Sequence, residues 1–359
     1  MKKVCFIAQF PPPIHGLSKA VQTLYDSDMH DDMEFEKIDI KNNKKFLINM
    51  IKILNSKADL FYFTISQTKG GNIRDLIILK LLEIRNKKYV IHLHGGNYLR
   101  KMIDNDVPKW QKKQNYKLIS KAQRVIVLSK SLISTFSGII SENKISVIPN
   151  CIDNQFLLSE ENYKTKKENI KKREVRNVLY LSNFIKEKGY EYVLELANIE
   201  KNNFEKTGIR KYNFQFAGKF FEERDKKSFF EYIEKNKLNE YVKYYGIVDG
   251  KEKNNLLKEA DSLILLTTYF REGQPISILE GMGNGLVIIA TNHTAIPDMI
   301  KDNVNGIIVD KSNVDTNVLY EKMNNINYET ISSNNYEECK KYSEIEYLNN
   351  CLECFRQCL

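Results

Sequence analysis

The sequence predicts two doubly wound α/β domains that follow one another along the chain. Short apolar runs of strand length alternate with longer segments of helix length throughout the 359 residues. Several of these runs are continuously apolar, as in parallel strands covered on both faces. The alternation breaks once, at a polar, Lys/Glu-rich stretch at 158–176, and then restarts. We therefore expect domains at 1–157 and 177–340, a linker between them, and a terminal helical segment at 341–359.

Each half supplies six candidate strands with helices between them. The first half has strands at 4–10, 35–40, 60–66, 89–95, 124–129 and 144–149, and helices near 17–27, 44–56, 72–85, 109–120 and 130–138. The second half has strands at 177–181, 213–217, 242–246, 262–266, 286–290 and 306–309, and helices near 188–201, 224–236, 251–259, 275–283, 296–301 and 314–325. A last helix is expected near 343–357. Ligands of such folds bind beyond the carboxyl ends of the strands, so the loops at those ends carry the functional residues.

Composition indicates a globular protein, with 42% apolar and 28% charged residues. No apolar run reaches the ~18 residues that would span a bilayer, and no signal-peptide pattern follows Met1. We expect a cytoplasmic protein. Six cysteines are scattered along the chain. The last three, Cys351, Cys354 and Cys358, share one helix face and are expected to be buried thiols rather than zinc ligands.

The net charge of +9 is concentrated in two segments. In the first, apolar residues alternate with Lys41, Lys44, Lys45, Lys52 and Lys57, without an acidic residue among them. In the second, six basic residues of 100–117 surround Trp110 and Tyr116. Basic amphipathic segments suit contact with an anionic membrane at the inner face of the cell membrane. An ordinary surface helix with a core-facing stripe explains the same pattern.

Residues 260–292 are the most informative stretch, because they combine a buried strand, a polar loop, a helix and a second buried strand. Pro275 suits the first helical position, and the helix start offers free N–H groups and a positive dipole end to a phosphate. Glu272 precedes that start, and Glu280 lies roughly 7 Å beyond it at the α-helical rise. Carboxylates accept hydrogen bonds from hydroxyls and repel phosphate. We therefore expect phosphate at the helix start and sugar hydroxyls at the two glutamates.

The motif E-G-Q-P-x-x-x-L-E-x-M-x-x-G, from Glu272 to Gly285, resembles the signature of family GT4 of the GT-B glycosyltransferases. The resemblance implies that Glu272 lies near the donor sugar and that Glu280 binds the nucleotide ribose. It also implies two facing Rossmann-like domains, an acceptor-side domain followed by a nucleotide-sugar-binding domain. The terminal helix is expected to pack back on the first domain.

In the first domain, the strand at 4–10 leads to Gly16, where backbone can approach a ligand closely. The family has two glycines near the donor phosphate here, and His15 replaces the first. The strand at 89–95 carries His92 and His94 on one face. The resemblance places a functional histidine near the donor sugar, and we assign that role to His94. The alternative is a structural histidine.

In the second domain, residues 182–189 resemble the family pattern G-R-x-x-x-E-K-G. Lys188 matches the pattern and supplies a point charge for the diphosphate. Asn183 occupies the arginine position and donates a hydrogen bond without charge, so the helix start takes a larger share of phosphate binding. Gly218, Ile247 and Val248 follow the next two strands and, by resemblance, lie around the base.

The resemblance implies a retaining, metal-independent glycosyltransferase of the hexosyltransferase type. The catalytic candidates are His94, Glu272 and Lys188. The donor-binding candidates are Gly16, Asn183, Lys188, Gly218, Ile247, Val248, Gly273, Gln274, Pro275, Ile276 and Glu280. The donor is expected to be a nucleotide sugar, a UDP-sugar, which acts as co-substrate, so no cofactor is expected. The acceptor is expected to be a glycan or lipid-linked sugar in surface polysaccharide or glycolipid synthesis.

Two other functions remain open from the sequence. One is another enzyme on the same fold, such as a nucleotide-sugar epimerase or a glycosidase. The other is a noncatalytic basic protein that binds nucleic acid or membrane, although nucleic acid is not an expected partner of the glycosyltransferase. Asp-x-Asp pairs at 26–28 and 104–106 match the metal-binding letters of other glycosyltransferases. Neither pair follows a predicted strand, so we do not assign a metal to them.

Overall fold

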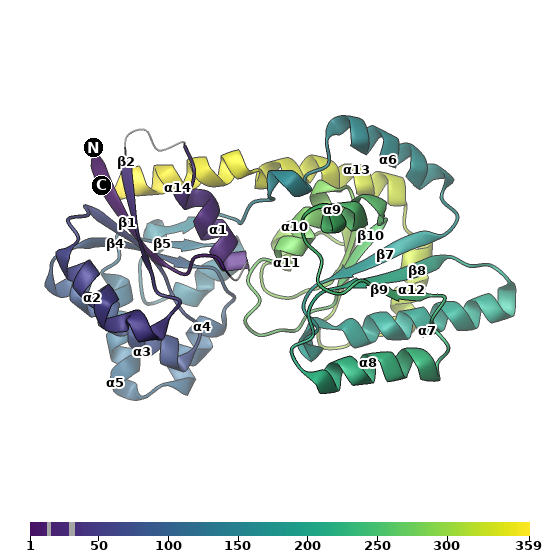
Figure 1. The fold of residues 1–359 in the computed structure, drawn as a ribbon, viewed down its shortest axis with the longest axis horizontal. Helices are drawn as coiled ribbons and strands as arrows, with labels where there is room; N and C mark the ends of the chain where they lie inside the picture. Colours follow the sequence, from purple (N-terminus) through teal and green to yellow (C-terminus); the bar gives the residue numbers. More distant parts are fainter. Residues whose placement is uncertain (13–15, 29–32) are drawn as a thin grey trace. The chain divides into compact units, whose positions relative to one another are not determined.

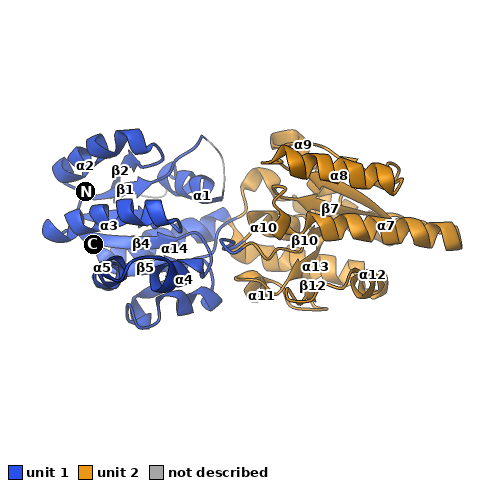
Figure 2. Cartoon of the chain, turned by 90° about the horizontal axis from the view of Figure 1, so that it is seen from below, with its two compact units in different colours: residues 1–151, 270–274, 344–359 blue, residues 152–269, 275–343 orange. Residues whose placement is uncertain are grey.

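The computed structural model describes residues 1–12, 16–28 and 33–359, which form two compact units. Unit 1 contains Met1–Cys151, Phe270–Gln274 and Glu344–Leu359, and unit 2 contains Ile152–Tyr269 and Pro275–Ser343 (Figure 2). Each unit is a parallel sheet of six strands with helices around it, which confirms the doubly wound α/β fold.

The sheet of unit 1 has the strand order β2-β1-β3-β4-β5-β6, with every neighbouring pair parallel. Its strands are β1 (Lys2–Ala8), β2 (Met33–Asp39), β3 (Leu60–Thr64), β4 (Lys88–Leu93), β5 (Arg124–Val127) and β6 (Ile145–Val147). The order reverses between β1 and β3, where the loops after neighbouring strands turn toward opposite faces of the sheet.

The helices of unit 1 are α1 (Gly16–Tyr25), α2 (Phe46–Asn55), α3 (Lys69–Ile84), α4 (Tyr98–Lys101), α5 (Lys109–Ser120) and α14 (Glu344–Cys358) (Figure 1). The segment expected as an α-helix at 130–138 is a 3₁₀ helix, Lys130–Phe136. As expected, α14 joins the core of the first unit. The Phe355 ring lies 5.6 Å from Tyr62 and 6.0 Å from Phe6. The last three cysteines are buried in the same cluster, as expected.

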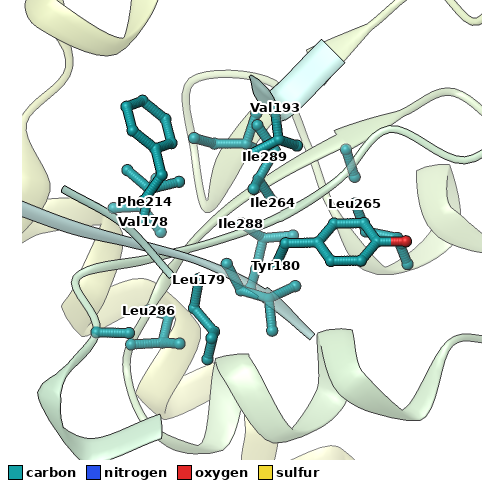
Figure 3. Packing of buried hydrophobic residues seen from close by; sticks show 14 of the residues in the cluster. Val178, Leu179, Tyr180, Val193, Phe214, Ile264, Leu265, Leu286, Ile288 and Ile289 are labelled. Atoms are coloured by element: carbon teal, nitrogen blue, oxygen red, sulfur yellow. The ribbon is translucent and has the colours of Figure 1, made fainter. Parts of the chain in front are cut away.

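The sheet of unit 2 has the order β12-β11-β10-β7-β8-β9, again with parallel pairs throughout. Its strands are β7 (Arg176–Leu181), β8 (Tyr212–Ala217), β9 (Val242–Tyr244), β10 (Ser262–Leu265), β11 (Val287–Thr291) and β12 (Gly306–Val309). Figure 3 shows side chains from β7, β8, β10 and β11 packed with Val193 in its core. These are the continuously apolar runs of the sequence, and they are buried because helices lie on both faces.

The helices of unit 2 are α6 (Glu160–Lys172), α7 (Tyr190–Thr207), α8 (Glu223–Lys235), α9 (Gly250–Glu259), α10 (Ile276–Gly283), α11 (Ile296–Met299), α12 (Thr316–Asn325) and α13 (Tyr328–Glu338). Two of them, α6 and α13, were not expected.

The expected linker at 158–176 is wrong, because most of it forms α6 and belongs to unit 2. The side chain of Ser159 caps the helix start, and Tyr163, Lys166 and Ile170 are buried at helical spacing. The middle position of this buried face is a lysine, so the apolar periodicity is hidden. The Tyr163 ring stacks on Tyr336 of α13 at 3.8 Å, which fixes α6 to unit 2.

Candidate functional site

In unit 2, the strand order reverses between β7 and β10, so the loops that follow these two strands lie next to each other. Glycine at 189 makes this packing close. Gly189 has φ +78°, and a Cβ there would lie 2.4 Å from the carbonyl oxygen of Leu266. The N–H of Thr268 donates to the carbonyl of Glu187 at 2.6 Å, which ties the two loops together.

Lys188 therefore lies where a phosphate-binding cation is expected, on the loop between β7 and α7. Its side chain is half-buried, and its Nζ lies 5.5 Å from the centre of the Tyr269 ring on the loop after β10. The two loops that carry the sequence motifs are thus brought together. Asn183 is exposed at the start of the same loop, and its carbonyl accepts a hydrogen bond from the Tyr180 hydroxyl at 2.9 Å.

The helix of the central motif begins one residue later than expected. Pro275 is the cap residue of α10 (φ −65°, ψ 118°), and Ile276 is the first helical residue. No described side chain caps this helix start, and Ile276 and Ser277 are half-buried. The orphan N–H groups of a first turn need partners, so this helix start retains the capacity to bind an anion.

Glu280 lies on α10 and is almost completely buried, with 3% of its surface exposed. Its Oε1 accepts a hydrogen bond from the Lys253 Nζ of α9 at 2.6 Å, which also makes the two an ion pair. Burial raises the pKa of the Glu280 carboxyl, and the charge of Lys253 opposes that rise. Lys253 also lies 4.0 Å over the Phe156 ring. The carboxylate is thus held in one place with its charge supported by a neighbouring cation.

The loops after β8 and β9 follow the loop after β7 in the strand order of the sheet. Gly218 has φ +149°, and a Cβ there would lie 1.9 Å from the carbonyl oxygen of Ser182. Only glycine allows the loop after β8 to approach the loop after β7 this closely. After β9, the side chain of Ile247 is 70% exposed and Val248 is half-buried.

In unit 1, the end of β4 carries a cluster of two histidines and a tyrosine. As the strand alternation predicts, His92 and His94 lie on one face, with ring centroids 3.8 Å apart. The Tyr62 hydroxyl lies 2.8 Å from His92 Nδ1 and 3.2 Å from His94 Nε2. Burial lowers the pKa of His92 well below its ordinary value, and the neighbouring His94 adds to this effect. His92 is therefore neutral.

The hydrogen-bond network assigns the hydrogens of this cluster. Among the described residues, His92 Nε2 has no hydrogen-bond partner, so its single hydrogen is best placed on Nδ1, where it donates to the Tyr62 oxygen. The Tyr62 O–H then donates to His94 Nε2. The Tyr62 hydroxyl thus orients the His94 ring.

The loop Phe270–Gln274 belongs to unit 1 and lies against the end of β4. A Cβ on Gly273 would lie 2.7 Å from the carbonyl oxygen of His94, so this position requires a residue without a side chain. Glu272, the residue before it, is half-buried. The structure thus brings together His94 and the loop that carries Glu272.

Gln274 has a structural contact that the sequence did not indicate. Its side chain is buried, and its Oε1 accepts a hydrogen bond from the N–H of Asn150 at 2.7 Å. The Gln274 backbone carbonyl also accepts from the Asn150 side chain at 3.3 Å. Gly16 is exposed at the start of α1, and His15 lies outside the described residues.

Two residues of the site were missed by the sequence reasoning. Lys253 lies on a helix rich in charged residues, and nothing in its neighbours distinguishes it from a solvated lysine. Tyr62 lies in the buried strand β3, LFYFT, where the sequence gives no sign that a tyrosine is more than a core residue. A buried tyrosine needs a partner for its hydroxyl, and that signal could have been used.

The family model of glycosyl transferases group 1 matches residues 161–343 of this chain. An uncharacterised 41.2 kDa protein from the cps region of Klebsiella pneumoniae is 27% identical over 269 residues, which cover 74% of this chain and 68% of that protein. The amylovoran biosynthesis glycosyltransferase AmsK of Erwinia amylovora is 32% identical over 73 residues, 19% of this chain and 18% of that protein.

Solved structures share the fold. HepE of Anabaena, in complex with UDP, superposes with a TM-score of 0.74 at 16% identity, covering 99% of this chain and 100% of that one. The same protein in complex with UDP-glucose gives a TM-score of 0.71. This likeness shows a common GT-B fold. Since the family model covers residues 161–343, just over half of the 359 residues, the chain belongs to the glycosyl transferases group 1.

Proposed function

We propose that this glycosyltransferase moves a hexosyl group from a UDP-sugar to a glycan or lipid-linked acceptor in surface polysaccharide or glycolipid synthesis. The anomeric configuration of the sugar is retained, and no metal or cofactor takes part. The observation that carries the proposal is the arrangement in unit 2, where an uncapped helix start and a buried, charge-supported glutamate lie on α10. Lys188 lies on the loop between β7 and α7. This loop packs against the end of β10, the strand that precedes α10.

The nucleotide is the part of the donor that unit 2 binds. The ribose hydroxyls donate hydrogen bonds to Glu280, whose position and ionisation Lys253 maintains. The loops at Gly218, Ile247 and Val248 surround the base. Because Glu280 is buried beside a fixed cation, its carboxylate needs little reorganisation to bind a diol.

The diphosphate becomes more negative as the sugar leaves, so preorganised positive groups accelerate this step. Lys188 supplies a full charge, and the backbone N–H groups of Gly273, Gln274 and Ile276 supply partial charges at the helix start. Asn183 adds a neutral donor where the family has arginine. Its lack of charge is the reason that the helix start carries more of the stabilisation in this chain.

The sugar is positioned by Glu272 and His94, whose loops are packed together in unit 1 through Gly273. Glu272 accepts hydrogen bonds from sugar hydroxyls. His94, oriented by the Tyr62 hydroxyl, contacts the sugar. In a retaining transfer of this kind, the acceptor oxygen attacks from the face that the diphosphate leaves.

Names of similar proteins support the substrate classes. UDP and UDP-glucose are bound by HepE. A protein of a cps region and an enzyme of amylovoran biosynthesis are among the relatives in sequence. A UDP-sugar donor and a polysaccharide-type acceptor are therefore the first to test.

The test is a thermal-shift screen of UDP, GDP, ADP and their glucose conjugates, with and without EDTA. A ligand that binds the folded state raises the melting temperature, by an amount that grows with its concentration over Kd. UDP and UDP-sugars are expected to raise it, and EDTA is expected to have no effect. Lys188→Gln should weaken the shift from UDP more than the shift from uridine, because uridine lacks the diphosphate.

Product analysis then distinguishes the alternatives. A transferase releases UDP only when an acceptor is present, and the anomeric proton of the product shows retention by its NMR coupling. Conversion of the sugar with the nucleotide still attached would indicate an epimerase. Salt-sensitive DNA binding with no shift from any nucleotide would indicate a noncatalytic basic protein.

A further inference from the structure

Helix α2 has apolar side chains on two opposite faces. Its inner face is formed by the buried residues Asn49 and Ile53, together with the half-buried Phe46 and Met50. Its outer face carries large apolar side chains that are exposed, namely Leu47 (75%), Ile48 (55%), Ile51 (57%) and Leu54 (45%). One face is sufficient to attach a helix to a core, so the outer face has no role in the packing of unit 1.

The neighbouring helix also exposes apolar side chains. Helices α2 and α3 lie side by side, and the Arg85 side chain after α3 donates to the carbonyl of Ile53 at 2.8 Å (Figure 1). Ile73 and Ile77 of α3 are 46% and 45% exposed, one turn apart and away from the core side of their helix. Leu47, Ile48, Ile51, Leu54, Ile73 and Ile77 are called the α2–α3 face below.

The lysines on and beside α2 carry positive charge without compensation. Lys44, Lys45, Lys52 and Lys57 are exposed, and residues 40–58 contain no Asp or Glu. Within the part of the chain that the structure describes, none of these four lysines takes part in an ion pair. Their charges are therefore available to a partner.

The second basic segment of the sequence differs in this respect. Arg100 and Lys112 both pair with Asp104, and Lys117 lies 3.5 Å from Glu83. Asp104 and Glu83 thus offset part of the positive charge of this segment. The segment exposes one large apolar side chain, Trp110, whereas α2 exposes four.

We infer that the α2–α3 face is a contact surface for a bilayer containing anionic lipids. Aliphatic side chains enter the interface between headgroups and acyl chains, while lysines at the rim pair with lipid phosphates. Protein interfaces are depleted of lysine, and single-stranded nucleic acids select aromatic stacking platforms, which this aliphatic face lacks. No described helix has the length and apolar character to cross a bilayer.

The inference concerns where the enzyme works and does not depend on the identity of its donor. A contact of one ten-residue helix and part of another is reversible. It concentrates the protein at the surface where a lipid-linked acceptor would lie.

The test is flotation of the full chain with two sets of vesicles, one of phosphatidylcholine alone and one with phosphatidylglycerol added. The wild-type protein should float with the anionic vesicles only, and high salt should reduce the bound fraction because it screens the lysines. Two variants probe the two parts of the surface. One is Leu47→Gln with Ile51→Gln, and the other is Lys44→Gln with Lys45→Gln and Lys52→Gln.

The lysine variant should lower the partition coefficient about a hundredfold, at about fivefold per charge near an anionic surface. The apolar variant should lose detectable binding. Both should keep the wild-type melting temperature and the UDP-induced shift, which separates failure of this inference from failure of the proposed function.

Matched controls use equally exposed residues elsewhere. Val318→Gln with Ile345→Gln removes two helix-borne apolar side chains that are 54% and 60% exposed. Lys206→Gln with Lys235→Gln and Lys322→Gln removes the same charge from unit 2. Both controls should bind vesicles like the wild type.

Three results would overturn the inference: equal flotation with both vesicle sets, no flotation with either, or equal losses in the control variants. Dimerisation that depends on Leu47 and Ile51, without vesicle binding, would assign the face to a second copy of this chain instead.

Discussion

Removing the carboxylate of Glu280 tests both its structural and its functional role. In Glu280→Ala, the ammonium of Lys253 loses its partner while its side chain is only 17% exposed. Breaking a buried ion pair costs about 3–5 kcal/mol. The residual exposure of Lys253 and its contact with the Phe156 ring place this case at the lower end, about 3 kcal/mol. For a domain of this size, that corresponds to a fall in Tm of about 6–12 °C.

The same variant should lose its response to UDP. A ligand at about 100 times its Kd stabilises a protein by about 2.7 kcal/mol, which is about 5–10 °C for the wild type. If Glu280 binds the ribose, UDP should raise the Tm of Glu280→Ala much less. Differential scanning fluorimetry with and without UDP measures both effects in one experiment.

A double variant separates the two roles. Glu280→Leu with Lys253→Met replaces the ion pair by apolar side chains, a change that is often neutral for stability or favourable. It should recover most of the Tm and still lack the UDP shift. If this variant shows the wild-type UDP shift, Glu280 does not bind the ribose. If Glu280→Ala has the wild-type Tm, the reasoning about the buried pair is refuted.

Three further outcomes are expected. Tyr62→Phe removes the hydroxyl that contacts both His92 and His94. Because the role of Tyr62 is to orient His94, this variant should lower kcat about tenfold to a hundredfold with little change in KM. A changed KM with normal kcat would contradict this role. Gly273→Ala would place a methyl group 2.7 Å from the His94 carbonyl and should lower activity strongly by displacing the loop of Glu272, and near-normal transfer rates would refute the close packing. Burial lowers the pKa of Lys166 to about 7. The unfolded chain therefore binds more protons than the folded one between pH 7 and 10, and the free energy of unfolding should rise with pH in that range. Urea unfolding of Lys166→Met should lose this pH dependence, and an unchanged slope would show that Lys166 is not its source.

The sequence determined most of the fold, because the strands of both sheets are buried on two faces and are therefore continuously apolar. Besides the short helix α4, the sequence missed two longer helices, and these have buried faces interrupted by polar residues. On α6 the interruption is Lys166, and on α13 it includes Ser332 and Asn335. Asn335 donates to the carbonyls of Leu286 and Asn305, so hydrogen bonds satisfy the polar part of this buried face. Apolar periodicity cannot detect such a face.

The candidate site was predictable where backbone geometry determines the residue type. Gly189, Gly218 and Gly273 are glycines because a Cβ would overlap a neighbouring loop, and such positions produce a recognisable motif. Partners that come from distant parts of the chain were not predictable. The contact of Lys253 with Glu280 spans 27 residues and that of Asn150 with Gln274 spans 124. No local pattern in the sequence encodes them.

The position of α14 has a consequence for biosynthesis. Phe355 and its neighbours fill the same core as Phe6 and Tyr62, although all of unit 2 separates them along the chain. Every residue of unit 2 is translated before α14, so unit 2 can close its core while the N-terminal half still exposes an unfilled apolar surface. A nascent chain of this protein should therefore bind chaperones through its N-terminal half until α14 has been synthesised.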